Sequence, residues 1–335
     1  MSAPLISVQD LTIRFKTDEG LITAVENVSY DIAPGEILGV VGESGSGKSV
    51  SAKALMRLNG GNTVYDEASR ITLNVPGEAP LEVLGLQRER DMMQVRGGAI
   101  SMLFQDPMAS FAPAITVGDQ MVEQLTLHTD MTRKQAKAHS IDMLNRVGIP
   151  EPAKRFGQYA FEFSGGMRQR AMIAMALSTS PKLLIADEPT TALDVTIQAQ
   201  VIDLMHDLVA EYGMAILFIT HDLGVIAQTA DRVAVMYLGR ILETGSVRDV
   251  IRNPAHAYTQ GLINALPKLD DLDAPLTPIP GDIPSPLERP KGCVFHPRNT
   301  QLAPGSRYER EVPPMTEVSP GHFAALFPED VVRAG

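Results

Sequence analysis

Cysteine is almost absent from this sequence of 335 residues, since Cys293 is the only one. A single cysteine excludes an intramolecular disulfide framework and a zinc site built from several thiolates. Basic residues are also few, with 29 Lys and Arg against 40 Asp and Glu and a net charge of −11. This balance argues against a broad nucleic-acid-binding surface, because such a surface needs clustered Lys and Arg. A local basic patch is the alternative that composition leaves open.

Long apolar runs and targeting signals are missing as well. No apolar run approaches the roughly 18 residues of a membrane-spanning helix, and the run at 214–220, MAILFIT, has the length of a buried strand. The first residues, MSAPLISVQD, lack the basic-then-apolar pattern of a signal peptide. We therefore expect a cytosolic protein that reaches any membrane by docking to another protein.

The order of sequence patterns predicts an α/β protein. Residues 1 to about 85 are rich in strand patterns, and residues from about 87 to 180 are mainly helical. Strand patterns then return in KLLIAD, AILFIT and RVAVMY, the last two separated by a segment of helical length. Alternation of strand and helix predicts a parallel sheet covered by helices.

The clearest helix is predicted at Thr132–Val147. Thr132 and Gln135 fit a capping box at its start, and Gly148 provides a stop signal. Ile141, Leu144 and Val147 are expected to form one apolar stripe.

Proline marks a change in composition near residue 254. Of the 24 prolines, 14 lie between Pro254 and the end of the chain. Proline lacks a backbone donor and clashes with the preceding helical turn, so this segment should contain no long helix. We expect a loop-rich appendage or a semi-ordered tail. The polar segment 60–98 has no evident role in the sequence.

A phosphate-binding loop is the strongest motif. The sequence GESGSGKS fits G-x-x-x-x-G-K-[ST] and lies between a predicted strand and a predicted helix. Glycines permit the tight turn, backbone N–H groups hold phosphates, Lys48 neutralises charge and Ser49 ligates Mg²⁺. The predicted nucleotide-binding residues of this loop are Gly42, Glu43, Ser44, Gly45, Ser46, Gly47, Lys48 and Ser49.

Two carboxylates end the apolar strand in LLIADEP. Asp187 is expected to hold Mg²⁺, and Glu188 to orient and polarise an attacking water. The carboxyl ends of parallel strands are where open α/β sheets bind ligands, which supports both roles. Without the phosphate loop, a solvated acidic turn would explain the pair equally well.

Two further polar residues follow apolar runs. His221 ends AILFITH and could sense a γ-phosphate, although a lone histidine is more often a structural hydrogen-bonding residue. Gln105 follows SMLF, where an amide could equally cap a turn.

A second glycine-containing loop, EFSGGMRQR at 162–170, resembles half of a phosphate site but lacks a lysine that would bind the phosphate.

These elements, in this order, resemble the ATP-binding subunits of ABC transporters, and the resemblance covers residues 5 to about 300. It implies a P-loop NTPase cassette with a RecA-like core, an antiparallel β subdomain, a helical subdomain at about 87–180 and a proline-rich C-terminal extension. The expected boundaries are 1–253 for the ATPase domain and 254–335 for the extension.

The resemblance also implies roles for the motif residues. Glu188, His221 and Gln105 would be catalytic, while Ser49, Gln105 and Asp187 would hold Mg²⁺. In this family two cassettes meet head to tail, so the signature Ser164, Gly165 and Gly166 would bind the ATP held by the facing subunit. Asp194 would belong to the D-loop, and Phe15 would stack on adenine, with a core-facing Phe15 as the alternative.

Further segments resemble the dipeptide and oligopeptide importer ATPases, among them VGESGSGKSV, FSGGMRQRAMIAMAL, NPAHAYTQGLINALP and GCVFHPR. The resemblance implies ATP and Mg²⁺ as ligands and a place at the cytoplasmic face of the bacterial inner membrane. Its implied partners are a second related ATPase (or a second copy of this chain), two permease subunits and, indirectly, an extracytoplasmic solute-binding protein. No nucleic-acid partner is expected.

The sequence departs from this subgroup at an iron–sulfur motif. Many relatives supply four cysteines near GCxFHPRC, whereas this chain has Cys293 alone and Asn299 at the next ligand position. We therefore predict no cluster, and expect proline-rich packing to hold the tail.

The transported solute is expected to be a peptide, with oligosaccharide, opine, nickel or glutathione uptake as alternatives. A non-transport ABC ATPase is the remote alternative.

Overall fold

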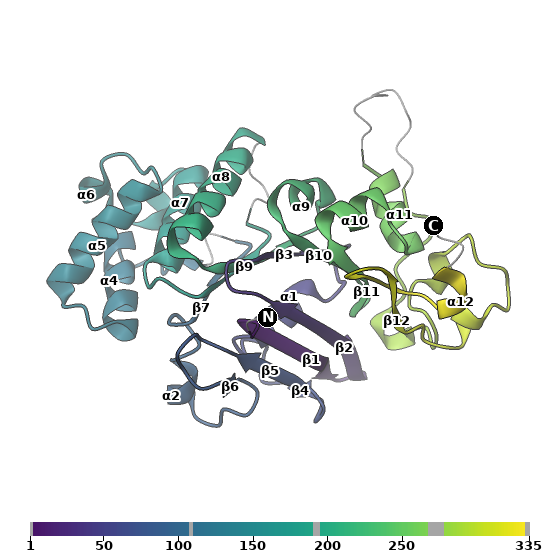
Figure 1. Cartoon of the computed structure of the whole chain (residues 1–335). Helices are drawn as coiled ribbons and strands as arrows, with labels where there is room; N and C mark the ends of the chain where they lie inside the picture. The colour runs from purple at the N-terminus through teal and green to yellow at the C-terminus, as the bar shows by residue number, and fades with distance from the viewer. Residues whose placement is uncertain (1–2, 107–109, 190–194, 267–277, 332–335) are drawn as a thin grey trace. The chain divides into compact units, whose positions relative to one another are not determined.

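The structure, a computed structural model, describes residues 3–106, 110–189, 195–266 and 278–331 (Figure 1). The chain divides into two compact units, each assembled from segments that are distant in sequence. The first unit comprises Met1–Ile6, Ile32–Glu36 and Thr72–Ile219, and the second comprises Ser7–Asp31, Ile37–Ile71 and Thr220–Gly335. Within the described ranges, no helix combines the length and apolar character needed to cross a bilayer.

In the described residues of the first unit, three strands (β7, β8 and β9) run parallel and are accompanied by a group of helices. Its elements are β6 (Leu81–Glu82), α2 (Glu89–Met92), β7 (Ile100–Leu103), α4 (Val117–His128), α5 (Arg133–Arg146), α6 (Pro152–Arg155), η1 (Ala160–Glu162), α7 (Gly165–Leu177), β8 (Leu183–Asp187), α8 (Val195–Tyr212) and β9 (Ala215–Thr220). Strand β8 is central, with Ile100 of β7 opposite Leu183 and Leu183 opposite Ala215 of β9. All five residues of β8 are buried, which is expected for a parallel strand covered on both faces.

Helices α4, α5 and α7 pack together in the first unit (Figure 1). The predicted capping box of α5 is confirmed: Thr132 Oγ1 accepts the N–H of Gln135, and Gln135 Oε1 accepts the N–H of Thr132. Gly148 follows the helix with φ 74°, a conformation that favours glycine. The predicted apolar stripe was partly wrong, because Leu144 and Val147 are buried whereas Ile141 is only half-buried.

The second unit contains a mixed sheet and the end of the chain. Its elements are β1 (Ile6–Thr17), β2 (Gly20–Ile32), β3 (Ile37–Val41), α1 (Lys48–Ala54), β4 (Thr63–Tyr65), α9 (Leu223–Thr229), β10 (Arg232–Tyr237), β11 (Arg240–Ser246), α10 (Val247–Arg252), α11 (Ala257–Asn264), η2 (Pro286–Glu288), η3 (His296–Arg298), η4 (Arg307–Glu309), β12 (Met315–Ser319), β13 (His322–Ala325) and α12 (Pro328–Val331). Along the sequence, strand β5 (Arg70–Leu73) contains the division between Ile71 of the second unit and Thr72 of the first.

The proline-rich segment adds two strands to the sheet of the second unit. The strand order there is β12-β13-β11-β10-β3, with β3 parallel to β10 and the remaining neighbours antiparallel. Figure 1 shows these last strands in yellow beside β11. In the described part of this segment the longest helix is α11, with eight residues, in agreement with the expectation of no long helix, but the two strands were not predicted from the sequence. The segment 60–98, which had no evident role, supplies β4, β5, β6 and α2.

Candidate functional site

The predicted phosphate loop lies between β3 and α1 of the second unit. Two of its glycines are required by close approach of other backbone atoms. A Cβ on Gly42 would lie 2.0 Å from the carbonyl oxygen of Met236, and a Cβ on Gly47 would lie 2.6 Å from that of Ala24. Gly45 and Gly47 also have φ of 78° and 96°, which other residues rarely adopt. Close approach of other backbone atoms and positive φ values therefore explain why glycine occupies these positions of the motif.

Lys48 is anchored by the loop that precedes it. Its ammonium donates to the carbonyl oxygens of Gly42 at 2.7 Å and Glu43 at 3.0 Å, and to Ser46 Oγ at 3.4 Å. The side chain is 5% exposed. Charge-assisted bonds of this kind are stronger than neutral ones, so the cation is held in a defined place at the loop.

The other nucleotide-binding residues predicted in this unit differ in exposure. Ser44 and Gly45 are exposed, and Ser49 is half-buried. Phe15 is half-buried on β1, opposite Thr63 of β4, and does not belong to the fully buried core. Its proposed stacking on adenine stays a prediction.

Asp187, Glu188 and Gln105 meet in the first unit. Asp187 ends β8 and is 5% exposed, so the strand delivers its carboxylate to the sheet edge. Glu188 follows in the left-handed region with φ 49°, and its N–H donates to the carbonyl oxygen of Ile219 at 2.9 Å. Gln105 Nε2 donates to Glu188 Oε2 at 2.8 Å across 83 residues of sequence. This contact joins the segments that follow two neighbouring parallel strands, β7 and β8.

The second glycine loop begins helix α7. Ser164 is the N-cap, and its Oγ accepts the N–H of Met167 at 3.3 Å, which leaves the hydroxyl hydrogen able to donate to a ligand. Ser164 and Gly165 are exposed, and no atom lies within 4 Å of a Cβ built on Gly165. Behind them, Gln169 Nε2 donates to the carbonyl oxygen of Pro189 at 2.6 Å. The first residues of α7 are thus exposed, while Gln169 of the same helix is hydrogen-bonded to the turn that follows Glu188.

Two predicted residues receive less support. His221 is exposed directly after β9, and Asp222 caps α9 by accepting the N–H groups of Gly224 and Val225. Asp194 lies outside the described residues.

Sequence reasoning missed two residues at the phosphate loop. The N–H of Glu43 donates to the phenol oxygen of Tyr258 at 2.9 Å, and Arg298 forms two hydrogen bonds with the Glu43 carboxylate. In the sequence, the segments that contain them, NPAHAYTQ and GCVFHPR, indicate only the importer subgroup. No local pattern links either residue to a loop more than 200 positions away.

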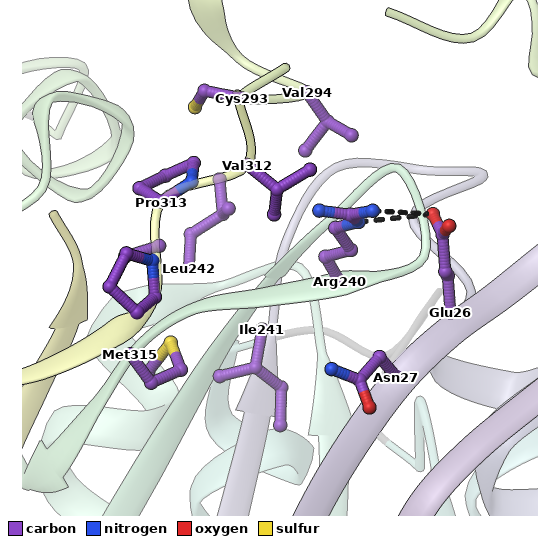
Figure 2. Close-up of a pocket in the computed structure, with 12 residues that line it drawn as sticks. Glu26, Asn27, Arg240, Ile241, Leu242, Cys293, Val294, Val312, Pro313 and Met315 are labelled. Atoms are coloured by element: carbon purple, nitrogen blue, oxygen red, sulfur yellow. Dashed lines mark hydrogen bonds and ion pairs between the residues drawn. The ribbon is translucent and has the colours of Figure 1, made fainter. Parts of the chain in front are cut away.

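Cys293 lies at a small cavity of about 210 Å³ in the second unit (Figure 2). Its neighbours in the lining are largely apolar, among them Val294, Val312 and Pro313. The thiol is 3% exposed, and burial raises its pKa. His256 Nε2 lies 3.9 Å from its sulfur. A buried protonated thiol beside apolar side chains behaves as a small core residue.

Comparison with known proteins gives the family. Residues 25–191 match the family described as ABC transporter, and residues 242–304 match the C-terminal region of oligopeptide/dipeptide transporters. The oligopeptide transport ATP-binding protein OppD of Salmonella typhimurium is 47% identical over 329 residues, covering 96% of this chain and 93% of the relative. OppD of Bacillus subtilis is 48% identical over 320 residues, covering 95% of this chain and 87% of the relative.

A solved structure shows the same fold. The dimeric ATP-binding cassette MJ0796, in a post-hydrolysis state bound to ADP and Pi, superposes with a TM-score of 0.63 at 24% identity, over 72% of this chain and 99% of that one. The predicted α/β P-loop cassette is thereby confirmed. The chain belongs to the ATP-binding subunits of ABC transporters, in the group that includes the oligopeptide transport ATP-binding proteins, and it is an ATPase.

Proposed function

We propose that this chain hydrolyses ATP to power the import of peptides through an ABC transporter. The observation that carries the proposal is similarity along nearly the whole chain, including the C-terminal region, to proteins named for oligopeptide transport. The phosphate loop and the Gln105–Glu188 pair supply the chemistry that this activity needs. Oligosaccharides, opines, nickel and glutathione are the alternative solutes, and a non-transport ABC ATPase is the remote alternative.

Each unit contributes a distinct part of the proposed reaction. In the second unit, the loop from Gly42 to Ser49 binds the phosphates of ATP, and Lys48 neutralises their charge. In the first unit, the Glu188 carboxylate orients and polarises the attacking water, and the Gln105 amide holds that carboxylate in place. His221 senses the γ-phosphate. Phe15 and Asp194 complete the nucleotide contacts.

The residues expected to hold Mg²⁺ fit its chemistry. Asp187, Gln105 and Ser49 offer a carboxylate, an amide and a hydroxyl oxygen, which are the hard donors that this ion prefers. Asp187 is the anionic member, buried at a strand end. When bound, Mg²⁺ neutralises charge on the transferred phosphoryl group.

A second cassette is needed for turnover in this proposal. Ser164, Gly165 and Gly166 lie at the exposed start of α7 and would donate a hydroxyl and N–H groups to the γ-phosphate held by a partner. The partner is a related ATPase, with a second copy of this chain as the alternative. Two permease subunits anchor the pair at the cytoplasmic face of the inner membrane, and an extracytoplasmic solute-binding protein delivers the solute.

An iron–sulfur cluster does not fit the residues present. Four thiolates cannot come from a chain with one cysteine, and the side chains around Cys293 are mostly apolar. The absence of a cluster stays a prediction for the purified protein. We further propose that residues 1–253 form the ATPase domain, with the helical subdomain at about 87–180, and that residues 254–335 form the C-terminal extension.

The proposed function is tested by transport itself. Deleting the gene should abolish uptake of a labelled tripeptide, and the wild-type chain should restore it whereas the Glu188→Gln variant should not. Affinity capture of the tagged chain from detergent-solubilised membranes should recover permease subunits. If peptide uptake stayed normal while oligosaccharide or nickel uptake was lost, the transported solute would be an oligosaccharide or nickel and not a peptide. Recovery of nucleic acid without membrane proteins would support the remote alternative.

A further inference from the structure

Glu43, the second residue of the phosphate loop, is held at each of its polar groups. Its N–H donates to the phenol oxygen of Tyr258 at 2.9 Å, and its carbonyl oxygen accepts from Lys48 Nζ at 3.0 Å. Its carboxylate accepts from both terminal nitrogens of Arg298, at 2.6 and 3.2 Å. Arg298 lies 255 residues along the chain from Glu43, in the C-terminal segment. The C-terminal segment therefore contacts the nucleotide-binding loop directly, within one compact unit.

Arg298 is itself fixed by the surrounding tail. Its side chain is 4% exposed, and its Nε and Nη2 donate to the carbonyl oxygens of Pro280 at 2.9 Å and Ile279 at 3.2 Å. Nη1 also reaches the phenol oxygen of Tyr237 at 3.4 Å. Burial disfavours the charge, but the bonds with Glu43 and Tyr237 outweigh it and raise the pKa of Arg298. The guanidinium is thus a permanently charged, rigidly placed anchor for the loop.

The position of Glu43 matters for the lysine that grips phosphate. The carbonyl oxygens of Gly42 and Glu43 are two acceptors of the Lys48 ammonium. Glu43 adjoins Gly42, whose backbone lies so close to Met236 that an added Cβ would be 2.0 Å from the Met236 carbonyl oxygen. Fixing the Glu43 carboxylate and N–H limits the conformations of the loop. A loop already ordered before binding pays less entropy when it binds its ligand.

We propose that Arg298 is a positioning residue for ATP: by holding Glu43, the C-terminal extension sets the phosphate loop in its binding conformation. The proposal rests on the ATP-binding role given above to this loop. It extends that role by making nucleotide affinity depend on the tail. A tail that merely packs against the cassette predicts a different outcome, in which loss of Arg298 lowers stability without changing nucleotide affinity.

The test compares three variants of the full chain by equilibrium binding of a fluorescent ATP analogue with Mg²⁺. Arg298→Lys keeps the charge but loses the planar fork, and Glu43→Gln keeps the size but loses the carboxylate. Both should raise the Kd for ATP about tenfold, within the range usual for coupled sites. The matched control is Arg289→Lys, another mostly buried arginine of the tail, whose ion pair at 2.8 Å is with Glu26 of β2. Its Kd should stay within about twofold of wild type, because its ion pair is with Glu26 and not with a residue of the phosphate loop.

Thermal unfolding separates positioning from folding. Glu43 is 27% exposed, so Glu43→Gln should fold even if Arg298→Lys does not. An unchanged Kd in a folded Glu43→Gln variant would overturn the proposal, as would an equal increase in the Arg289→Lys control. The double variant Glu43→Gln with Arg298→Lys should be no weaker than either single variant, because both remove one interaction. Additive tenfold losses would also overturn it.

Reciprocity gives a second readout. If the loop and the tail are coupled, ATP must stabilise the tail by the same factor that the tail strengthens ATP binding. Hydrogen exchange at the Arg298 N–H, which donates to the carbonyl oxygen of Phe295 at 3.0 Å, should therefore slow when ATP is added. This protection should be lost in Glu43→Gln at saturating ATP. If wild type binds no ATP at all, the proposed function fails; if it binds ATP without these effects, only the role of Arg298 fails.

Discussion

Gln105 donates a 2.8 Å hydrogen bond to Glu188 and so joins the segment after β7 to the turn after β8. The bond fixes one carboxylate oxygen of a residue whose own backbone is in the left-handed region. A general base must be held in place to be effective, and such a base typically contributes about 100- to 10,000-fold to a rate. Glu188→Gln should therefore lower kcat by roughly that factor while ATP binding persists. Steady-state hydrolysis in the assembled transporter with equilibrium ATP binding would check this, and unchanged turnover would remove Glu188 from the mechanism.

Lys48 is the second residue whose loss has a defined consequence. Lys48→Ala removes the buried ammonium that contacts Gly42 and Glu43, and with it the positive charge that faces phosphate. We expect ATP binding to fall below detection in calorimetry. Lys53→Ala in the same helix is the control, and it should bind ATP normally because Lys53 lies in the last turn of α1. Near-normal ATP affinity of the Lys48 variant would mean that the loop does not bind phosphate.

The local motifs could be predicted because their chemistry is encoded in consecutive residues. Each motif depends only on residues that are close together in the sequence. This holds for GESGSGKS, for the carboxylates after LLIA and for the Thr132–Gln135 capping box. The structure places them as expected, at a strand–loop–helix junction, a strand end and a helix start. The strands of the tail were missed because proline content argues only against helices. Strand β12 is a short, half-exposed segment with no strong apolar pattern.

The contacts of Arg298 could not be predicted from one sequence. Glu43 and Arg298 are 255 positions apart, and no sequence pattern around either residue indicates that the two are paired. The contact arises within the second unit, where Tyr237 of β10 packs against Tyr258 and Phe295 of the C-terminal segment at ring-centroid distances of 4.7 to 5.4 Å. The Arg298 guanidinium lies over the Tyr237 ring of this cluster, 5.7 Å from its centroid.

Stability should depend on pH through His256. The imidazole is fully buried, and burial lowers its pKa from 6.5 to about 4, although the Glu243 carboxylate acts in the opposite direction. Between these values the unfolded chain binds a proton that the folded chain does not, so the free energy of unfolding falls as pH drops. The total loss by pH 4 is about 3 kcal/mol, at roughly 1.4 kcal/mol for each unit of pKa difference.

Urea unfolding at several pH values measures this dependence. The matched variant is His256→Asn, because an asparagine oxygen can accept the N–H of Tyr258 and cap α11 as His256 does. It should flatten the pH dependence between pH 6.5 and 4. Identical slopes for wild type and variant would show that another group is responsible.

The exposed start of α7 allows a direct test of the shared active site. Gly165 has open space around it, so Gly165→Glu should fold, and a carboxylate at this helix N-terminus should stabilise the helix by about 0.3–1 kcal/mol. The same carboxylate would face the γ-phosphate of a partner's ATP, and like charges brought together cost several kcal/mol. We expect hydrolysis by the assembled transporter to fall at least about tenfold, while the separate chain binds ATP as wild type does. Gly165→Gln, similar in size but uncharged, should lose less activity. Full hydrolysis by Gly165→Glu would show that Ser164, Gly165 and Gly166 do not approach a nucleotide and that the signature loop serves another purpose.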